Sequence, residues 1–211
     1  SIQANASDPG GRGGVVEVFS AGTAYSGGAL QARGGPGGEG GFIELSALTP
    51  SLWSAPDISA PGGTPGVFLL DPTILTLIDT GPGTFDGSLP DLTGDPGAGT
   101  VSIQAINAVG SGTVILQATD SILWLDDTID INLATGVNLV MDAGNAIFVN
   151  SNNQIQGSDG SVTLLAGNTL QAPTINTGGP IVIDSQSGDV SLQGNLSSNA
   201  AITIEAGGDI F

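Results

Sequence analysis

Apolar residues alternate with small polar residues in short runs along most of the chain. The clearest runs place two aliphatic residues around one serine or threonine: Val162 and Leu164, Val190 and Leu192, Ile202 and Ile204. A period of two is typical of a strand with one buried face. The runs end at Gly, Asn, Asp or Ser, which favour turns. We therefore predict short β-strands, and no stretch has the capped 3.6-residue periodicity that predicts a helix.

The strand pattern recurs at nearly constant intervals. In the first half, Gly-Gly-Arg-Gly-Gly-Val-Val-Glu-Val (10–18), Gly-Gly-Glu-Gly-Gly-Phe-Ile-Glu-Leu (37–45) and Gly-Gly-Thr-Pro-Gly-Val-Phe-Leu-Leu (62–70) start 27 and 25 residues apart. In the second half, units starting at 136, 160, 179 and 199 lie 24, 19 and 20 residues apart. A unit of this size cannot bury its own apolar face, so the units have to stack on one another.

These repeats predict an all-β fold, namely a right-handed parallel β-helix (β-solenoid). About nine coils of 19–27 residues are expected. The handedness follows from the preference for right-handed crossovers between parallel strands. We expect one continuous solenoid with three regions: glycine-rich coils over 1–79 with an insertion at 48–60, an extra-helical loop at 80–98, and regular coils over 99–211.

A ladder of inward-pointing aliphatic side chains is expected to form the core. Its predicted members are Ile43, Leu45, Val162, Leu164, Val190, Leu192, Ile202 and Ile204, and the residues predicted to point outward are Glu17, Glu44, Thr163, Ser191 and Thr203. The alignment of the repeats stacks Arg12 on Glu39 and Glu17 on Glu44. The second stack places like charges about one strand spacing apart, and a bound cation or a proton would relieve it.

The charge balance restricts the partners. Twenty acidic residues face only Arg12 and Arg33, and the formal net charge is −18. Such a surface repels nucleic acid and anionic membranes, so we expect neither nucleic-acid binding nor membrane insertion. Cysteine is absent, and stacking of coils supplies the core that disulfides provide in small secreted domains. Ser1 is not an initiator methionine and no leader pattern follows it, so we interpret the chain as a piece of a longer product.

Catalysis is not expected. The chain has no histidine, cysteine or lysine, which removes most proton shuttles and covalent nucleophiles. The best carboxylate pair, Asp126 and Asp127, consists of neighbours that point to opposite faces of a strand. The glycine clusters at 10–14, 34–38 and 40–41 lack the Gly-Lys-Ser/Thr of a phosphate-binding loop, and we interpret them as solenoid turns.

Calcium is the only cofactor considered, and no other cofactor is expected. Acidic side chains supply the oxygen ligands that Ca²⁺ prefers. The candidate ligands are Asp126, Asp127, Asp130, Glu17 and Glu44.

One stretch resembles a known family. The segment Gly-Gly-Ala-Leu-Gln-Ala-Arg-Gly-Gly-Pro-Gly-Gly-Glu-Gly-Gly-Phe-Ile-Glu-Leu-Ser-Ala (27–47), followed by Gly-Val-Phe-Leu-Leu-Asp-Pro-Thr (66–73), is similar to secreted exoproteins of the filamentous-haemagglutinin type. The Gly-Asn-Thr-Leu and Gly-Asp-Val-Ser-Leu phrases within 167–192 resemble the repeats of that family. The resemblance implies a right-handed β-helix rod exported through an outer-membrane secretion partner, at the surface of a Gram-negative bacterium or a cyanobacterium.

These features together favour an extracellular, non-catalytic shaft of a surface adhesin or filament. One alternative is a module that binds a host or neighbour-cell glycan or a receptor, with Trp53 or the 80–98 loop as the contact. A carbohydrate-acting β-helix enzyme is the other alternative. Both ends of the chain fall within the repeat rhythm, so the chain is either a window on a longer covalent rod or a unit whose copies associate head to tail.

Overall fold

The computed structural model is a parallel β-solenoid with one short helix, and it describes residues 1–52, 54–78, 98–124 and 129–211. Every strand pair within these residues is parallel, as the sequence predicts for this fold class. Trp53, most of the 80–98 loop, Asp126 and Asp127 lie outside the described residues.

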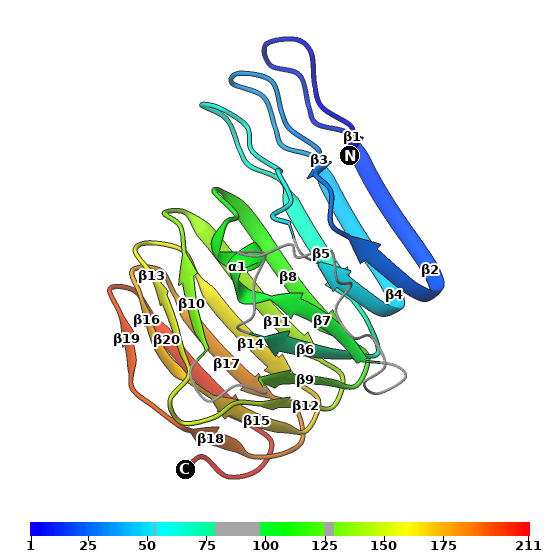
Figure 1. Ribbon diagram of the computed structural model, residues 1–211. Coiled ribbons are helices and arrows are strands. Elements are labelled where there is room, and N and C mark those ends of the chain that lie inside the picture. Colours follow the sequence, from blue (N-terminus) through cyan, green and yellow to red (C-terminus); the bar gives the residue numbers. More distant parts are fainter. Residues whose placement is uncertain (53, 79–97, 125–128) are drawn as a thin grey trace.

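The strands form three ladders along the solenoid (Figure 1). The first ladder, called face A, contains in spatial order β2 (Val15–Ser26), β4 (Phe42–Leu52), β5 (Val67–Asp71), β8 (Gly112–Ala118), β11 (Val137–Ala143), β14 (Val162–Ala166), β17 (Ile181–Ser185) and β20 (Ile202–Ala206). These eight strands make seven successive pairings. The solenoid therefore has about seven turns.

The second ladder, called face B, continues the later halves of β2 and β4. Its separate strands are, in spatial order, β7 (Ala98–Ser102), β6 (Ile74–Ile78), β9 (Ser121–Trp124), β12 (Ala146–Phe148), β15 (Thr169–Ala172) and β18 (Val190–Leu192). The third ladder, face C, consists of β1 (Ile2–Gln3) with β3 (Leu30–Gln31), and of β10 (Asp130–Leu133), β13 (Gln154–Gly157), β16 (Thr174–Thr177) and β19 (Leu196–Ser198).

The expectation of nine coils is wrong because one step of the solenoid uses far more chain than the others. Face A advances by 27 residues from Val15 to Phe42, but by 46 from Val67 to Thr113. Within this long step β7 pairs with both β4 and β6, so it lies between two strands that precede it in the sequence. Glycine is required at position 99 of β7, because a Cβ there would overlap the rings of Pro50 and Pro72.

An insertion was expected at 48–60, but residues 48–52 and 54–60 belong to the coil. Thr49–Leu52 continue β4 and pair with the end of β2, and Asp57 forms a parallel bridge with Gln31 on face C. Pro50 is accommodated within this strand, and the strand bends from face A to face B around the core. The apparent break in the repeat therefore reflects a long strand that turns a corner.

The short helix α1 (Ile103–Asn107) was not expected from the sequence. The Ser102 side chain caps it by accepting a hydrogen bond from the Gln104 N–H at 3.2 Å. The Asn107 side chain takes the hydrogen-bonding place of a neighbouring strand. Its Nδ2 donates to the Asp130 carbonyl at 3.1 Å, and its Oδ1 accepts from the Asn132 N–H at 2.7 Å. The helix thereby covers the edge of β10.

One continuous hydrophobic core fills the solenoid. The predicted ladder residues Ile43, Leu45, Val162, Leu164 and Val190 are at most 1 % exposed. Leu192 and Ile204 are half-buried against the core. Burial of Ile202 was expected and is not observed: it stacks on buried Ile181, but it is 41 % exposed because β20 has no described strand on its other side. The predicted outward residues are exposed (Glu17, Thr203) or half-buried (Glu44, Thr163, Ser191).

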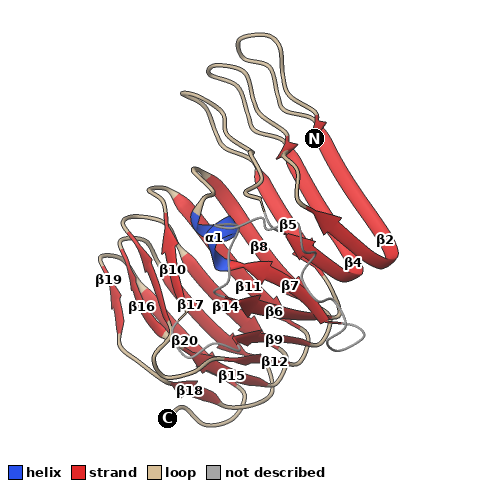
Figure 2. Ribbon diagram, viewed as in Figure 1, coloured by secondary structure: helices blue, strands red, loops and turns tan. Residues whose placement is uncertain are grey.

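The glycine-rich segments 4–14, 31–41 and 57–66 stack into a projection that we call the glycine fin; in Figure 2 it consists of loops that extend beyond the strands. Each tip is a Pro-Gly turn closed by one backbone bond: Gly11 N–H to Asp8 at 3.0 Å, Gly38 N–H to Gly35 at 2.9 Å and Gly63 N–H to Ala60 at 3.0 Å. Gly10, Gly37 and Gly62 take φ of 73°, 72° and 68°, the conformation that a type II turn requires. The glycine clusters are therefore turns and their supporting arms.

Candidate functional site

The outer surface of face A carries rows of side chains that run across the strands. Glu17 pairs with Glu44 and Glu44 with Leu69, in the register predicted from the repeats. The Ser46 hydroxyl donates to Glu44 Oε1 at 2.7 Å, which stabilises one of the two stacked carboxylates. The next row along the strands contains Phe19 and Ser46, followed by Asp71.

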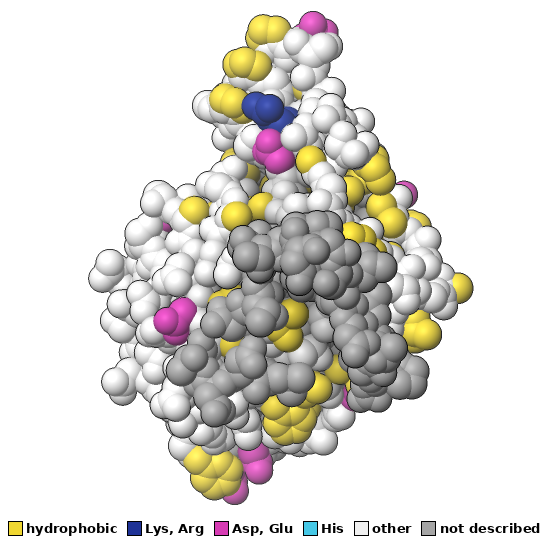
Figure 3. Space-filling view, viewed as in Figure 1, with side chains coloured by type: hydrophobic (Ala, Val, Ile, Leu, Met, Phe, Trp, Pro, Cys, Tyr) yellow, Lys and Arg dark blue, Asp and Glu magenta, His cyan; other side chains and the backbone are white. Residues whose placement is uncertain are grey.

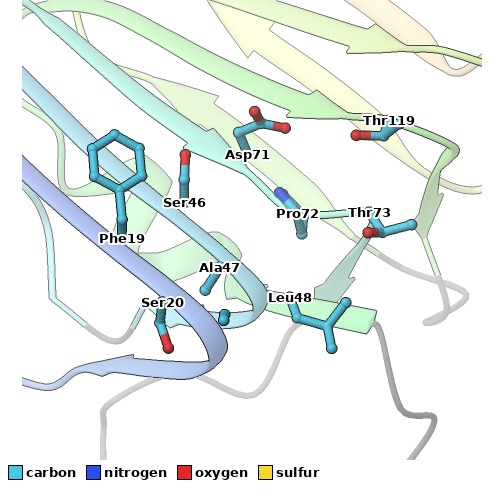
Figure 4. A pocket seen from close by; sticks show the side chains of 10 residues that line it. Phe19, Ser20, Ser46, Ala47, Leu48, Asp71, Pro72, Thr73 and Thr119 are labelled. Atoms are coloured by element: carbon cyan, nitrogen blue, oxygen red, sulfur yellow. The ribbon is translucent and has the colours of Figure 1, made fainter.

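A groove of about 550 Å³ lies beside this second row, where the chain passes from face A to face B. Its lining residues are Phe19, Ser20, Ala21, Ser46, Ala47, Leu48, Asp71, Pro72, Thr73 and Thr119. Figure 4 shows Phe19, Ser46 and Asp71 pointing to the same side of three neighbouring strands, with Leu48, Thr73 and Thr119 farther along the groove. Phe19 is 65 % and Leu48 46 % exposed, so the groove offers two large apolar side chains to solvent.

Asp71 is the only titratable side chain among these lining residues. Partial burial raises its pKa above the ordinary value, and the nearby carboxylates of Glu44 and Asp142 raise it further. Within the described residues no donor is hydrogen-bonded to the Asp71 carboxylate, and the side-chain hydroxyls of Thr73 and Thr119 also have no partner there. The groove therefore combines exposed apolar area with three polar groups that remain available to a ligand.

The two arginines lie on the glycine fin and are both paired. Arg12 Nε lies 3.6 Å from Glu39, as the stacking of repeats predicts, and Arg33 Nε lies 3.4 Å from Asp57. On the face shown in Figure 3, basic atoms occur only in the upper part, beside acidic atoms. The rest of the surface therefore has no formal positive side chain to attract an anionic ligand.

The calcium candidates do not come together in the part of the chain that the structure describes. No group of three or more acidic side chains there has a geometry that could hold a metal ion. Glu17 pairs with Glu44 across β2 and β4, and Asp130 pairs with Gln154 on face C. Asp126 and Asp127 lie outside the described residues.

The groove was not predicted from the sequence. The expected contact, Trp53, and residues 80–97 lie outside the described residues, whereas the groove is built by Phe19, Leu48 and Asp71 from three successive coils. Two signals pointed to it: Phe19 is an aromatic residue at an outward strand position, and Asp71 ends an otherwise apolar strand. Glycoside hydrolysis requires two facing carboxylates, and this lining contains one.

Comparison with protein-family models, with curated proteins and with solved structures found no match. Within the described residues, no helix is long and apolar enough to cross a membrane.

Proposed function

We propose that the chain is a structural, non-catalytic β-solenoid shaft of a bacterial surface adhesin or filament. The observation that carries this proposal is the unbroken ladder of face A, in which eight strands stack over a single hydrophobic core. Each coil contacts mainly its neighbours, so a solenoid of this kind transmits force and spans distance in proportion to its number of coils.

The acidic surface supports an extracellular location. A net charge of −18 keeps such a rod soluble, and counterions in an extracellular medium screen the repulsion between its coils. The core needs no disulfide, in agreement with the absence of cysteine. The resemblance to exoproteins of the filamentous-haemagglutinin type adds an outer-membrane secretion partner and a Gram-negative or cyanobacterial cell surface to the proposal.

Head-to-tail association of copies is part of the same proposal. Among the described residues, β2 pairs only with β4 and β20 only with β17. Such edges present unpaired backbone groups to a further strand. Sedimentation of the 211-residue chain over a range of concentrations tests this point: mass that rises with concentration supports stacking, whereas a monomer at every concentration contradicts it.

Immunogold labelling of the producing cells tests the shaft itself. Antibodies against the folded chain are applied to intact cells and, as a control, to lysed cells together with an antibody against a cytosolic protein. Labelling of intact cells along surface projections supports the proposal. Labelling that appears only after lysis refutes it.

A further inference from the structure

We propose that the groove beside Phe19 and Asp71 is a binding site for a neutral saccharide. This site goes beyond a shaft function, because a rod needs no ligand. The proposal depends on the side chains that line the groove, on their spacing and on the charge around them.

The spacing of the row fits two linked sugar rings. Phe19, Ser46 and Asp71 occupy equivalent positions on β2, β4 and β5, so the ring and the carboxylate are about 10 Å apart, two strand spacings. Pyranose rings in a chain repeat at about the spacing of neighbouring β-strands. With one sugar ring on Phe19, the next ring therefore lies over Ser46, one strand spacing away, and its far hydroxyls reach toward Asp71.

The chemistry of the two ends matches the two kinds of surface on a sugar. A pyranose has a face of C–H bonds, which packs against the electron-rich face of an exposed aromatic ring. It also has a rim of hydroxyls, which donate to a carboxylate and exchange hydrogen bonds with alcohols. Phe19 supplies the first surface, and Asp71 with the Thr73 and Thr119 hydroxyls supplies the second.

The electrostatic surroundings select a neutral ligand. Asp71 lies near the carboxylates of Glu44 and Asp142, which already raise its pKa. Both arginines are engaged with acidic partners on the glycine fin. A uronate or a sialylated glycan would bring a further negative charge into this field without a cation to meet it. The volume of about 550 Å³ belongs to an open, shallow groove, so a bound saccharide would keep one side in solvent.

Titration of the ¹⁵N-labelled chain with cellobiose, lactose, maltose and N,N′-diacetylchitobiose, followed by NMR, tests the proposal. We expect at least one of these disaccharides to shift the amide signals of Ser46, Asp71, Thr73 and Thr119. Hyaluronan disaccharide, which carries a carboxylate, is the anionic comparison and is expected to leave these signals unchanged.

Two variants with matched controls identify the contacts. Phe19→Ala should weaken binding about tenfold, whereas Phe148→Ala, which removes another exposed aromatic ring on face B, should not. Asp71→Asn should weaken binding, whereas Asp184→Asn, in the same outward row but outside the groove lining, should not. Signals that stay unshifted with all four neutral disaccharides overturn the proposal. The proposal is also overturned if a variant and its control lose the same amount of binding affinity, or if the hyaluronan disaccharide binds more tightly than the neutral disaccharides.

Discussion

The glycine fin gives a sharp prediction about how its tiers are held together. At Gly63 a Cβ would overlap the carbonyl oxygen of Gly38 in the tier below, and the obstructing group is backbone that cannot rotate away. Gly63→Ala should therefore separate the two tiers locally. Two backbone bonds lie beside the new methyl group: Thr64 N–H to Gly38 at 3.1 Å and Gly40 N–H to Thr64 at 2.8 Å.

The expected loss follows from these two bonds. A backbone hydrogen bond contributes about 1 kcal/mol net, so losing both should lower the free energy of unfolding of the fin by about 2 kcal/mol. Two matched substitutions separate the overlap from other effects. Gly62→Ala meets no atom within 4 Å but has φ of 68°, so it should cost about 1 kcal/mol from backbone strain alone. Gly22→Ala meets no atom within 4 Å and has no such φ, so it should be nearly neutral.

Amide hydrogen exchange provides the measurement, because it reports the opening of the fin separately from the unfolding of the body. In Gly63→Ala the Gly40 and Thr64 amides should exchange more than about tenfold faster than in the unmodified chain. Urea unfolding monitored by circular dichroism gives the accompanying change in stability. The reasoning is refuted if the Gly40 and Thr64 amides exchange at the same rate in Gly63→Ala as in Gly22→Ala.

Three further predictions concern the body of the solenoid. Leu164 is fully buried, so Leu164→Ala should lower the free energy of unfolding in urea by about 2–5 kcal/mol. Thr163 faces outward, so Thr163→Ala should change this free energy by less than about 0.5 kcal/mol. Equal losses in the two variants would contradict the strand register. Burial and neighbouring carboxylates raise the folded-state pKa of Asp71 above 3.8. The ionised form of Asp71 therefore lowers stability above the folded-state pKa, and this penalty disappears as the pH falls below 3.8. Asp71→Asn should raise the thermal midpoint at pH 7 but not at pH 3, and a gain at both pH values would contradict this cause. Glu17 and Glu44 stack as like charges, and among the described residues no group of three acidic side chains is placed to hold a metal ion. Sodium and calcium at equal ionic strength should therefore raise the thermal midpoint equally, with a smaller gain in Glu44→Gln. A gain specific to calcium would contradict this and reveal a metal site.

The sequence predicts the ladders because strand register follows from local repeats. The stack of Glu17, Glu44 and Leu69 and the Arg12–Glu39 pair needed only an alignment of similar segments. The alternation of apolar and polar residues likewise identifies the buried face of a strand, since one face packs on the core.

Local sequence does not determine the long step, the helix or the groove. Ser-Ile-Gln-Ala occurs at 1–4 and again at 102–105, but the first copy contributes strand β1 and the second opens α1. The difference comes from tertiary context, in which Asn107 at the end of α1 bonds to the edge of β10. The groove likewise depends on where three coils place Phe19, Leu48 and Asp71, and no single segment contains that information.

The position of β7 has a consequence for how the chain acquires its structure during synthesis. A solenoid whose coils follow chain order can wind continuously as it emerges, each coil templating the next. Here β6 emerges before β7, yet β7 lies between β4 and β6. A nascent chain that places β6 directly on β4 must later move it by one strand spacing, about 4.8 Å, to admit β7. Folding of the coils in order from the amino terminus therefore cannot proceed past this point until the chain has been synthesised as far as residue 102.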